Sequence, residues 1–124
     1  MRTIPLGHFN RNAELTMIAV CAHFGLRPTD ITGPSRRWSV VWPRWVFIHL
    51  VKQSTGCSTN ELGERLNRDH TTIIYSLSAL RNLVDTDRRA AEEFARVEAK
   101  VRAITNDIYG REDAQMPLPL FAVA

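Results

Sequence analysis

The sequence predicts an all-α protein with five or six helices packed in one unit. Three observations support this prediction. Apolar residues recur at helical spacings of three and four, no segment shows the alternation of a strand, and glycines and prolines fall between the apolar runs. The length of 124 residues is that of one ordinary domain. Apolar residues make up 44% of the chain and charged residues 23%, so a buried core is expected.

The N-terminal part predicts one helix followed by a short helical turn. Residues 12–24 carry apolar side chains at helical spacing, and Gly25 follows where a left-handed C-cap is needed. Residues 26–33 predict a single helical turn between breakers, and residues 34–38 predict a loop with a basic tip. Residues 1–11 are expected to form an N-terminal extension.

A long helix is predicted from about residue 39 to residue 54. Pro43 is expected in its first turn, where a missing N–H has little consequence, and Gly56 is expected to end it. The apolar face of this helix, with a charged end at Lys52, is expected to comprise Val41, Trp45 and Ile48.

The middle of the chain predicts a helix-turn-helix. Ser58-Thr59-Asn60-Glu61 has the pattern of a capping box, which opens a short helix ending at Leu66. Asn67-Arg68 forms the turn, and a second helix runs from about Asp69 to Val84. Asp69 is a residue type that caps helices well.

The C-terminal part predicts one more helix and a tail. Residues 85–87 are expected to break the preceding helix and to cap the next one, which should end at Gly110. Its apolar stripe is formed by Phe94, Val97, Val101, Ile104 and Ile108. We therefore expect a domain over residues 12–109 and a flexible tail over residues 110–124.

Charge is distributed unevenly along the chain. Residues 1–56 carry seven Lys and Arg against two acidic residues, giving +5, whereas residues 85–124 carry six against eight, giving −2. A basic N-terminal half suits a polyanion, because each neutralised phosphate releases counterions.

The start of the second helix of the helix-turn-helix carries diverse polar side chains. In this motif only the first residues of the second helix reach base edges in the major groove. Asp69 can accept from a cytosine amine, His70 can donate to a purine, and Thr71 and Thr72 offer hydroxyls and methyls. These four residues are the candidate base contacts.

The string Arg68-Asp69-His70-Thr71-Thr72-Ile73, preceded by the helix over 58–66 and the Ser35-Arg36-Arg37 loop, resembles the C-terminal DNA-binding domain of the bacterial replication initiator DnaA. The resemblance covers residues 12–102. It implies a Trp repressor-like all-α fold. It also implies that Asp69, His70, Thr71 and Thr72 recognise a DnaA box in the major groove, with Arg36 in the adjacent minor groove.

The resemblance also implies contacts to phosphates. By position these fall on Arg44, Lys52 and Arg68, and we add Arg37 and Asn60 as further candidate phosphate contacts. If four to six phosphates are neutralised, the logarithm of affinity should fall with the logarithm of salt concentration with a slope of about −4 to −5.

The sequence departs from the family pattern at several places. Asn67 replaces the usual Gly-Gly turn, which is one residue longer, and Asn60 replaces a proline on the first helix. Trp38 and Trp42 occupy loop and helix positions where basic residues are common. The resemblance does not include the ATPase module, so we expect a stand-alone protein that recognises DNA without initiating replication alone.

Several other function classes are disfavoured. Charges interrupt the most apolar stretch, residues 38–51, so no membrane span or membrane partner is expected, and residues 1–12 lack the order of a signal peptide. There is no P-loop, so no nucleotide is expected. Cys21 and Cys57 suggest reduced thiols, and their spacing to histidines is not typical of zinc sites. No metal, cofactor or catalytic activity is expected, so the protein is not expected to be an enzyme.

The expected function is sequence-specific binding of double-stranded DNA at a DnaA-box-like site, in a cytoplasmic, nucleoid-associated regulator of transcription or of replication initiation. Because one domain reading one short site is weakly selective, a second copy of this chain in a homodimer, or another regulatory protein, is a candidate partner.

The alternative function is that of a protein-interaction module without DNA affinity, which would use the stripe from Phe94 to Ile108 and the apolar tail 116–124. The tryptophans Trp38, Trp42 and Trp45 could stack on single-stranded bases, although the helical register of Trp45 favours a core position.

Overall fold

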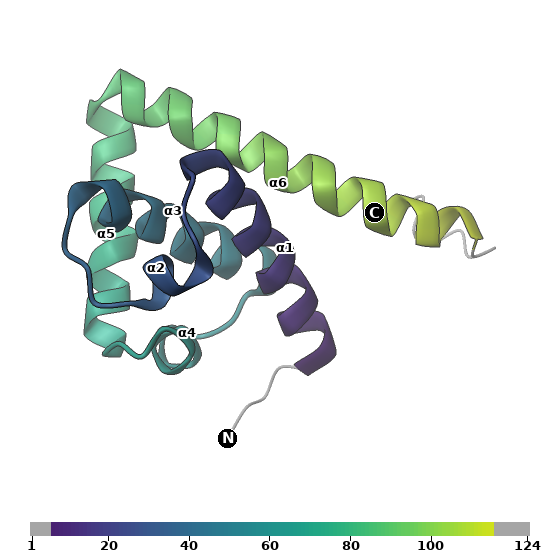
Figure 1. The fold of residues 1–124 in the computed structure, drawn as a ribbon, viewed down its shortest axis with the longest axis horizontal. Coiled ribbons are helices and arrows are strands. Elements are labelled where there is room, and N and C mark those ends of the chain that lie inside the picture. The colour runs from purple at the N-terminus through teal and green to yellow at the C-terminus, as the bar shows by residue number, and fades with distance from the viewer. Residues whose placement is uncertain (1–5, 116–124) are drawn as a thin grey trace.

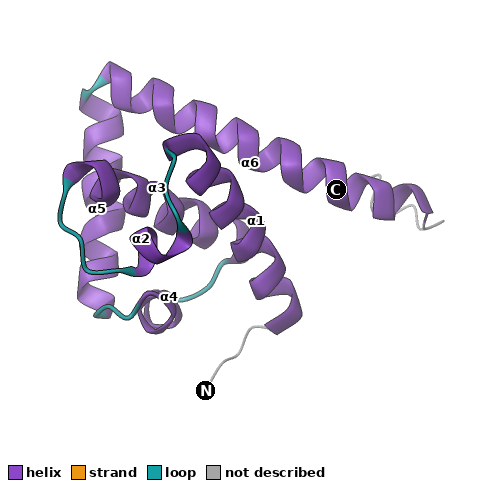
Figure 2. Cartoon of the chain, viewed as in Figure 1, coloured by secondary structure: helices purple, strands orange, loops and turns teal. Residues whose placement is uncertain are grey.

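The computed structural model describes the backbone of residues 6–115 and the side chains of residues 11–105. Within this range every regular element is a helix, as Figure 2 shows, so the all-α prediction is confirmed. The six helices of the described part are α1 (Leu6–Phe24), α2 (Pro28–Thr32), α3 (Trp38–Thr55), α4 (Thr59–Leu66), α5 (His70–Thr86) and α6 (Arg88–Gln115).

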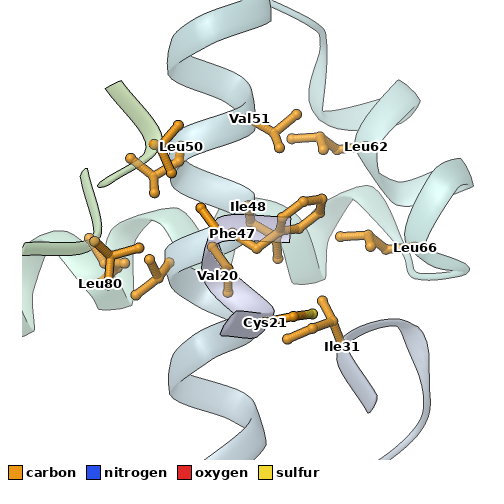
Figure 3. Packing of buried hydrophobic residues seen from close by; sticks show 14 of the residues in the cluster. Val20, Cys21, Ile31, Phe47, Ile48, Leu50, Val51, Leu62, Leu66 and Leu80 are labelled. Carbon is orange, nitrogen blue, oxygen red and sulfur yellow. The ribbon is translucent and has the colours of Figure 1, made fainter. Parts of the chain in front are cut away.

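Helix α3 lies at the centre of the molecule and contacts α1, α2, α4 and α5. Its side chains Val46, Ile48 and Val51 are fully buried, and the core around them receives residues from every neighbouring helix (Figure 3). A helix surrounded in this way is apolar on most of its circumference. The apolar face predicted for this helix was therefore too narrow. Trp42 and Phe47, which lie outside the predicted face, are buried, whereas Trp45, which was assigned to it, is only half-buried.

The helix ends follow local sequence signals. Gly25 and Gly56 adopt φ values of +68° and +67°, the left-handed conformation that glycine enters without steric cost. Pro43 is the sixth residue of α3, so it lies in the second turn and not in the first as predicted. Helix α1 begins at Leu6, six residues before the predicted start.

Helix α6 is longer than predicted. Asp87 alone separates it from α5, and its carboxylate accepts hydrogen bonds from the backbone N–H groups of Arg89 (2.9 Å) and Ala90 (3.1 Å) as the predicted cap. The helix continues through Gly110 to Gln115, because a glycine flanked by helix-forming residues lowers helix propensity without ending the helix. The predicted end at Gly110 is wrong, and residues 116–124 of the predicted tail lie outside the described residues.

The apolar stripe of α6 packs on the rest of the protein. Val97 is fully buried, Val101 is 9% exposed, and Phe94 and Ile104 pack against the same core. The side chain of Ile108 lies outside the described residues. Because the stripe from Phe94 to Ile104 is part of the core, its interpretation as a surface for a partner is wrong.

A carboxylate on α6 strengthens this packing. Glu93 accepts a hydrogen bond from Nε1 of Trp42 on α3 (2.9 Å), and its other oxygen lies 3.2 Å from Nε2 of His23 on α1. One acidic side chain thus joins three helices. Beyond this junction α6 extends past α1, as Figure 1 shows.

Candidate nucleic-acid interface

The helix-turn-helix is formed by α4, residues 67–69 and α5. The capping box is present as predicted, because Oγ of Ser58 accepts from the N–H of Glu61 and Oε1 of Glu61 accepts from the N–H of Ser58, both at 3.1 Å. These bonds satisfy N–H groups that the first helical turn leaves unpaired. The beginning of α4 is therefore fixed by residues within α4 and its cap.

The turn brings α4 and α5 very close together. Asn67 has a φ of +56°, which reverses the chain, and the N–H of Arg68 donates to the carbonyl of Gly63 at 2.7 Å. A Cβ atom at residue 63 would overlap the carbonyl oxygen of Arg68, so only glycine permits this approach. Leu66 and Ile73 are buried beneath the turn.

The beginning of α5 presents its side chains to solvent. Asp69, His70, Thr71 and Thr72 are all exposed, while Ile73 is buried on the inner side. The backbone carbonyl of Asp69 accepts from Thr72 and Ile73, but its carboxylate makes no capping bond, contrary to expectation. The carboxylate therefore remains available at the protein surface.

The basic loop between α2 and α3 lies beside α5. Arg36 and Arg37 are both exposed, and a groove separates the loop from the helix. Arg36 lines this groove together with Trp45, Thr72 and Tyr75. The fold therefore brings the predicted minor-groove arginine and a predicted base-contacting threonine to one face of the molecule.

Arg44 has a structural role. Its side chain is only 6% exposed, and its guanidinium donates to backbone carbonyls of the segment from α2 to the basic loop. The acceptors are the carbonyl oxygens of Ile31 (2.7 Å), Gly33 (2.9 Å), Ser35 (3.0 Å) and Asp30 (3.2 Å). Burial, with a smaller contribution from Arg68, lowers the pKa of Arg44 to about 10, so the group is still charged at neutral pH. This placement disfavours the expected contact of Arg44 with phosphate, because its guanidinium is engaged by these four carbonyls.

Arg68 and Lys52 also bond to backbone carbonyls. Arg68 is half-buried and donates to Leu66 (2.8 Å), Thr32 (3.2 Å) and Gly33, and its burial lowers its pKa. Lys52 is half-buried, and its Nζ donates to the carbonyl of Cys57 at 2.9 Å. Both cations are partly engaged within the protein.

A second groove lies between α4 and the start of α5. Its lining includes Asn60, Arg68, Asp69 and His70. Asn60 is exposed there. Arg68 lines both grooves and is the only predicted phosphate contact to do so among the described residues.

The sequence interpretation missed Tyr75. Its ring is 64% exposed and lies one turn after Thr71 on α5, and it contacts Trp45 edge to face with a centroid distance of 6.1 Å. Tyr75 lies four residues after Thr71, and residues four apart on a helix share one face, so this spacing could have identified Tyr75 from the sequence. Trp42, by contrast, is 6% exposed and cannot stack on bases.

Among the residues that the structure describes, no group of three His, Cys, Asp or Glu side chains could hold a metal ion. No helix in that part of the chain has the length and apolar character needed to cross a bilayer. Cys21 and Cys57 are buried free thiols, and burial raises the pKa of Cys21.

Comparison with known proteins identifies relatives of this chain. The family described as bacterial dnaA protein helix-turn-helix matches residues 14–79. Over 106 residues the chain is 34% identical to the chromosomal replication initiator protein DnaA of Thermomicrobium roseum. The aligned region makes up 85% of this chain and 21% of that protein. Identity to the DnaA proteins of Thermus thermophilus and Cereibacter sphaeroides is 40% over 70 residues and 37% over 75 residues, or 56% and 60% of this chain.

The chain thus corresponds to a small part of these relatives, since the matched region is about a fifth of the first and 16% of the other two. The matched family segment contains the basic loop, α4, the turn and the first part of α5 with its exposed start. The chain therefore belongs to the bacterial DnaA helix-turn-helix family.

Proposed function

We propose that this protein binds double-stranded DNA sequence-specifically at a site resembling a DnaA box. The observation that carries the proposal is the position of the exposed start of α5 next to the exposed arginine loop, on a helix-turn-helix of this family. A helix-turn-helix inserts this end of its second helix into the major groove.

Base recognition is assigned to the four residues that begin at Asp69. His70, Thr71 and Thr72 contact base edges and thymine methyls. The carboxylate of Asp69, which makes no capping hydrogen bond to α5, accepts from a cytosine amine. Arg36 enters the neighbouring minor groove, where a narrow A·T-rich segment attracts arginine.

Phosphate contacts are assigned to residues around these two elements. Arg37 and Asn60 are exposed, and Arg68 lies between the two grooves. Lys52 is retained as a weaker contact because its Nζ already donates to Cys57. Arg44 is not included, because its guanidinium bonds to four carbonyls.

The biological role that follows is modulation of DNA transactions in the cytoplasm, at the nucleoid. Its relatives bear the name of chromosomal replication initiator, and this chain matches about a fifth of the first of them. We infer a regulator of transcription or of replication initiation that occupies DnaA-box-like sites.

Selection of bound duplexes from a random pool tests the proposal. A single enriched motif resembling a DnaA box is expected. Fluorescence anisotropy with the enriched duplex and a scrambled duplex of the same composition then measures the specificity ratio. Recovery of no motif, or equal affinity for the two duplexes, would contradict sequence-specific binding.

A further inference from the structure

Three aromatic rings form a continuous row on the protein surface. Trp38, the first residue of α3, contacts Trp45 edge to face with a centroid distance of 5.3 Å and an interplanar angle of 87°. Trp45 contacts Tyr75 of α5 with a centroid distance of 6.1 Å and an angle of 78°. Trp38 is 54% exposed and Tyr75 is 64% exposed. We call these three residues the aromatic row.

The aromatic row connects the two elements that the proposed function assigns to base recognition. At one end Trp38 directly follows Arg36 and Arg37, and at the other end Tyr75 lies one turn after Thr71. Trp45 and Tyr75 line the same groove as Arg36 and Thr72. The row is therefore continuous with the proposed DNA surface and is flanked by positive charge.

We propose that the aromatic row is a further DNA contact, which packs against the sugar–phosphate backbone of the strand between the major and minor grooves. The proposal rests on the proposed function. If α5 enters the major groove and Arg36 the adjacent minor groove, the intervening strand passes over the groove lined by Trp45 and Tyr75. Deoxyribose carbons pack on the exposed rings, and the Tyr75 hydroxyl donates to a phosphate.

The orientation of the rings favours a duplex backbone over unpaired bases. A platform for single strands offers open ring faces on which successive bases stack. Here neighbouring rings of the row are nearly perpendicular, and Trp38 also stacks on buried Trp42 with an interplanar angle of 24°. The row therefore does not offer a series of parallel ring faces, and its rings at different angles suit an irregular sugar–phosphate surface.

Aromatic contacts and arginine contacts affect the salt dependence of binding differently. Each cation that neutralises a phosphate releases counterions, so its loss lowers the magnitude of the salt slope by about 1. Packing of a neutral ring on a sugar releases none. The aromatic row should therefore contribute affinity that is independent of salt and of base sequence.

The experiment compares Trp38→Ala, Tyr75→Ala and Tyr75→Phe with Ile18→Ala. Ile18 is an apolar residue of α1 that is 58% exposed and outside the row, so it is the matched control. Thermal denaturation first confirms that each variant is folded, and Trp38→Phe replaces Trp38→Ala if the latter is not. Anisotropy titrations use the enriched duplex, its scrambled form and an oligothymidine single strand at several salt concentrations.

We expect Trp38→Ala and Tyr75→Ala each to weaken binding to both duplexes by about five- to tenfold, with an unchanged salt slope. Tyr75→Phe should show a smaller loss of affinity, and the affinity of Ile18→Ala should remain within about twofold of wild type. In a separate measurement, saturating unlabelled duplex should change the tryptophan emission of the wild-type protein.

If the folded Trp38 and Tyr75 variants bind both duplexes with wild-type affinity, the proposal of a DNA-contacting aromatic row is overturned. The proposed function would remain intact. Loss confined to the single strand would overturn it as well, by assigning the row to unpaired bases. Failure of the wild-type protein to prefer the enriched duplex would instead contradict the proposed function.

Discussion

Arg44 of α3 and Arg68 of the helix-turn-helix both donate hydrogen bonds to the same carbonyl oxygen, that of Gly33. Gly33 lies just before the basic loop, and Arg68 lies just before the exposed start of α5. The shared acceptor therefore fixes the loop that carries Arg36 relative to the helix that carries His70. Two cations at one carbonyl also explain why Arg68 contributes to the lowered pKa of Arg44.

Replacing Arg44 with methionine should lower the free energy of unfolding by about 2–4 kcal/mol. The change keeps an apolar stem but removes the donors for four carbonyls, and unsatisfied buried acceptors are costly. Urea denaturation measures the effect. Exposed Arg37→Met is the control and should stay within about 0.5 kcal/mol of wild type. A loss of similar size in both variants would show that Arg44 has no special structural role.

Gly63→Ala should destabilise the helix-turn-helix by about 1–3 kcal/mol and weaken DNA binding. The added Cβ would overlap the carbonyl oxygen of Arg68, so α4 and the turn must separate. Thermal denaturation and duplex titration provide the two measurements. Glu64→Ala, at the next and exposed position of α4, is the control for stability and should stay within about 0.5 kcal/mol of wild type. Normal stability in the Gly63 variant would mean that the close approach is unimportant.

His70→Ala and Thr71→Ala should each weaken binding to the preferred duplex by about 1–3 kcal/mol, with little effect on scrambled DNA. Base contacts discriminate between sequences, whereas phosphate contacts do not. Arg37→Ala should instead weaken binding to both duplexes by similar factors. Equal losses on the two duplexes for the His70 and Thr71 variants would show that these residues do not recognise bases.

The salt dependence of duplex binding should be weaker than the sequence suggests. Of the cations among the predicted DNA contacts, Arg44 is buried and Nζ of Lys52 is bonded to Cys57, which leaves Arg36, Arg37 and the half-buried Arg68 to neutralise phosphates. At about −0.9 per neutralised phosphate, the slope of log affinity against log salt should be about −3. Titrations between low and moderate salt measure it, and a slope of −5 would restore the larger contact set.

Stability should fall as the pH is lowered from 7.5 to 5.5, in part because of His49. Burial lowers the pKa of His49 from 6.5, the charge of Arg81 lowers it further, and the charge of Glu98 raises it. The Nδ1 atom of His49 is buried without a hydrogen-bond partner among the described residues. Below pH 6.5 the unfolded chain binds a proton that the folded state resists, so acid favours unfolding, by at most about 1.4 kcal/mol per pH unit.

The test of this effect is His49→Leu, followed by urea denaturation at several pH values. The variant should lose less stability than wild type over the same pH range, because its site cannot be protonated. The edge-to-face contact of His49 with Phe94, at a centroid distance of 5.2 Å, is replaced by another apolar contact. An unchanged pH profile would assign the acid sensitivity to other groups.

Local features of this protein were determined by the sequence itself. The left-handed caps at Gly25 and Gly56, the capping box at Ser58 and the order of the helices depend on residues within one turn of each other, so spacing is enough to predict them. The motif at Asp69 identified the family for the same reason.

The tertiary structure decided what depends on residues distant in the chain. Arg44 became a buried donor because the carbonyls from Asp30 to Ser35 converge on it, and Tyr75 became part of a surface because α3 and the basic loop pack beside α5. Burial and hydrogen bonding are properties of the assembled helices, so the same arginine pattern that predicts phosphate contacts can instead hold a loop in place.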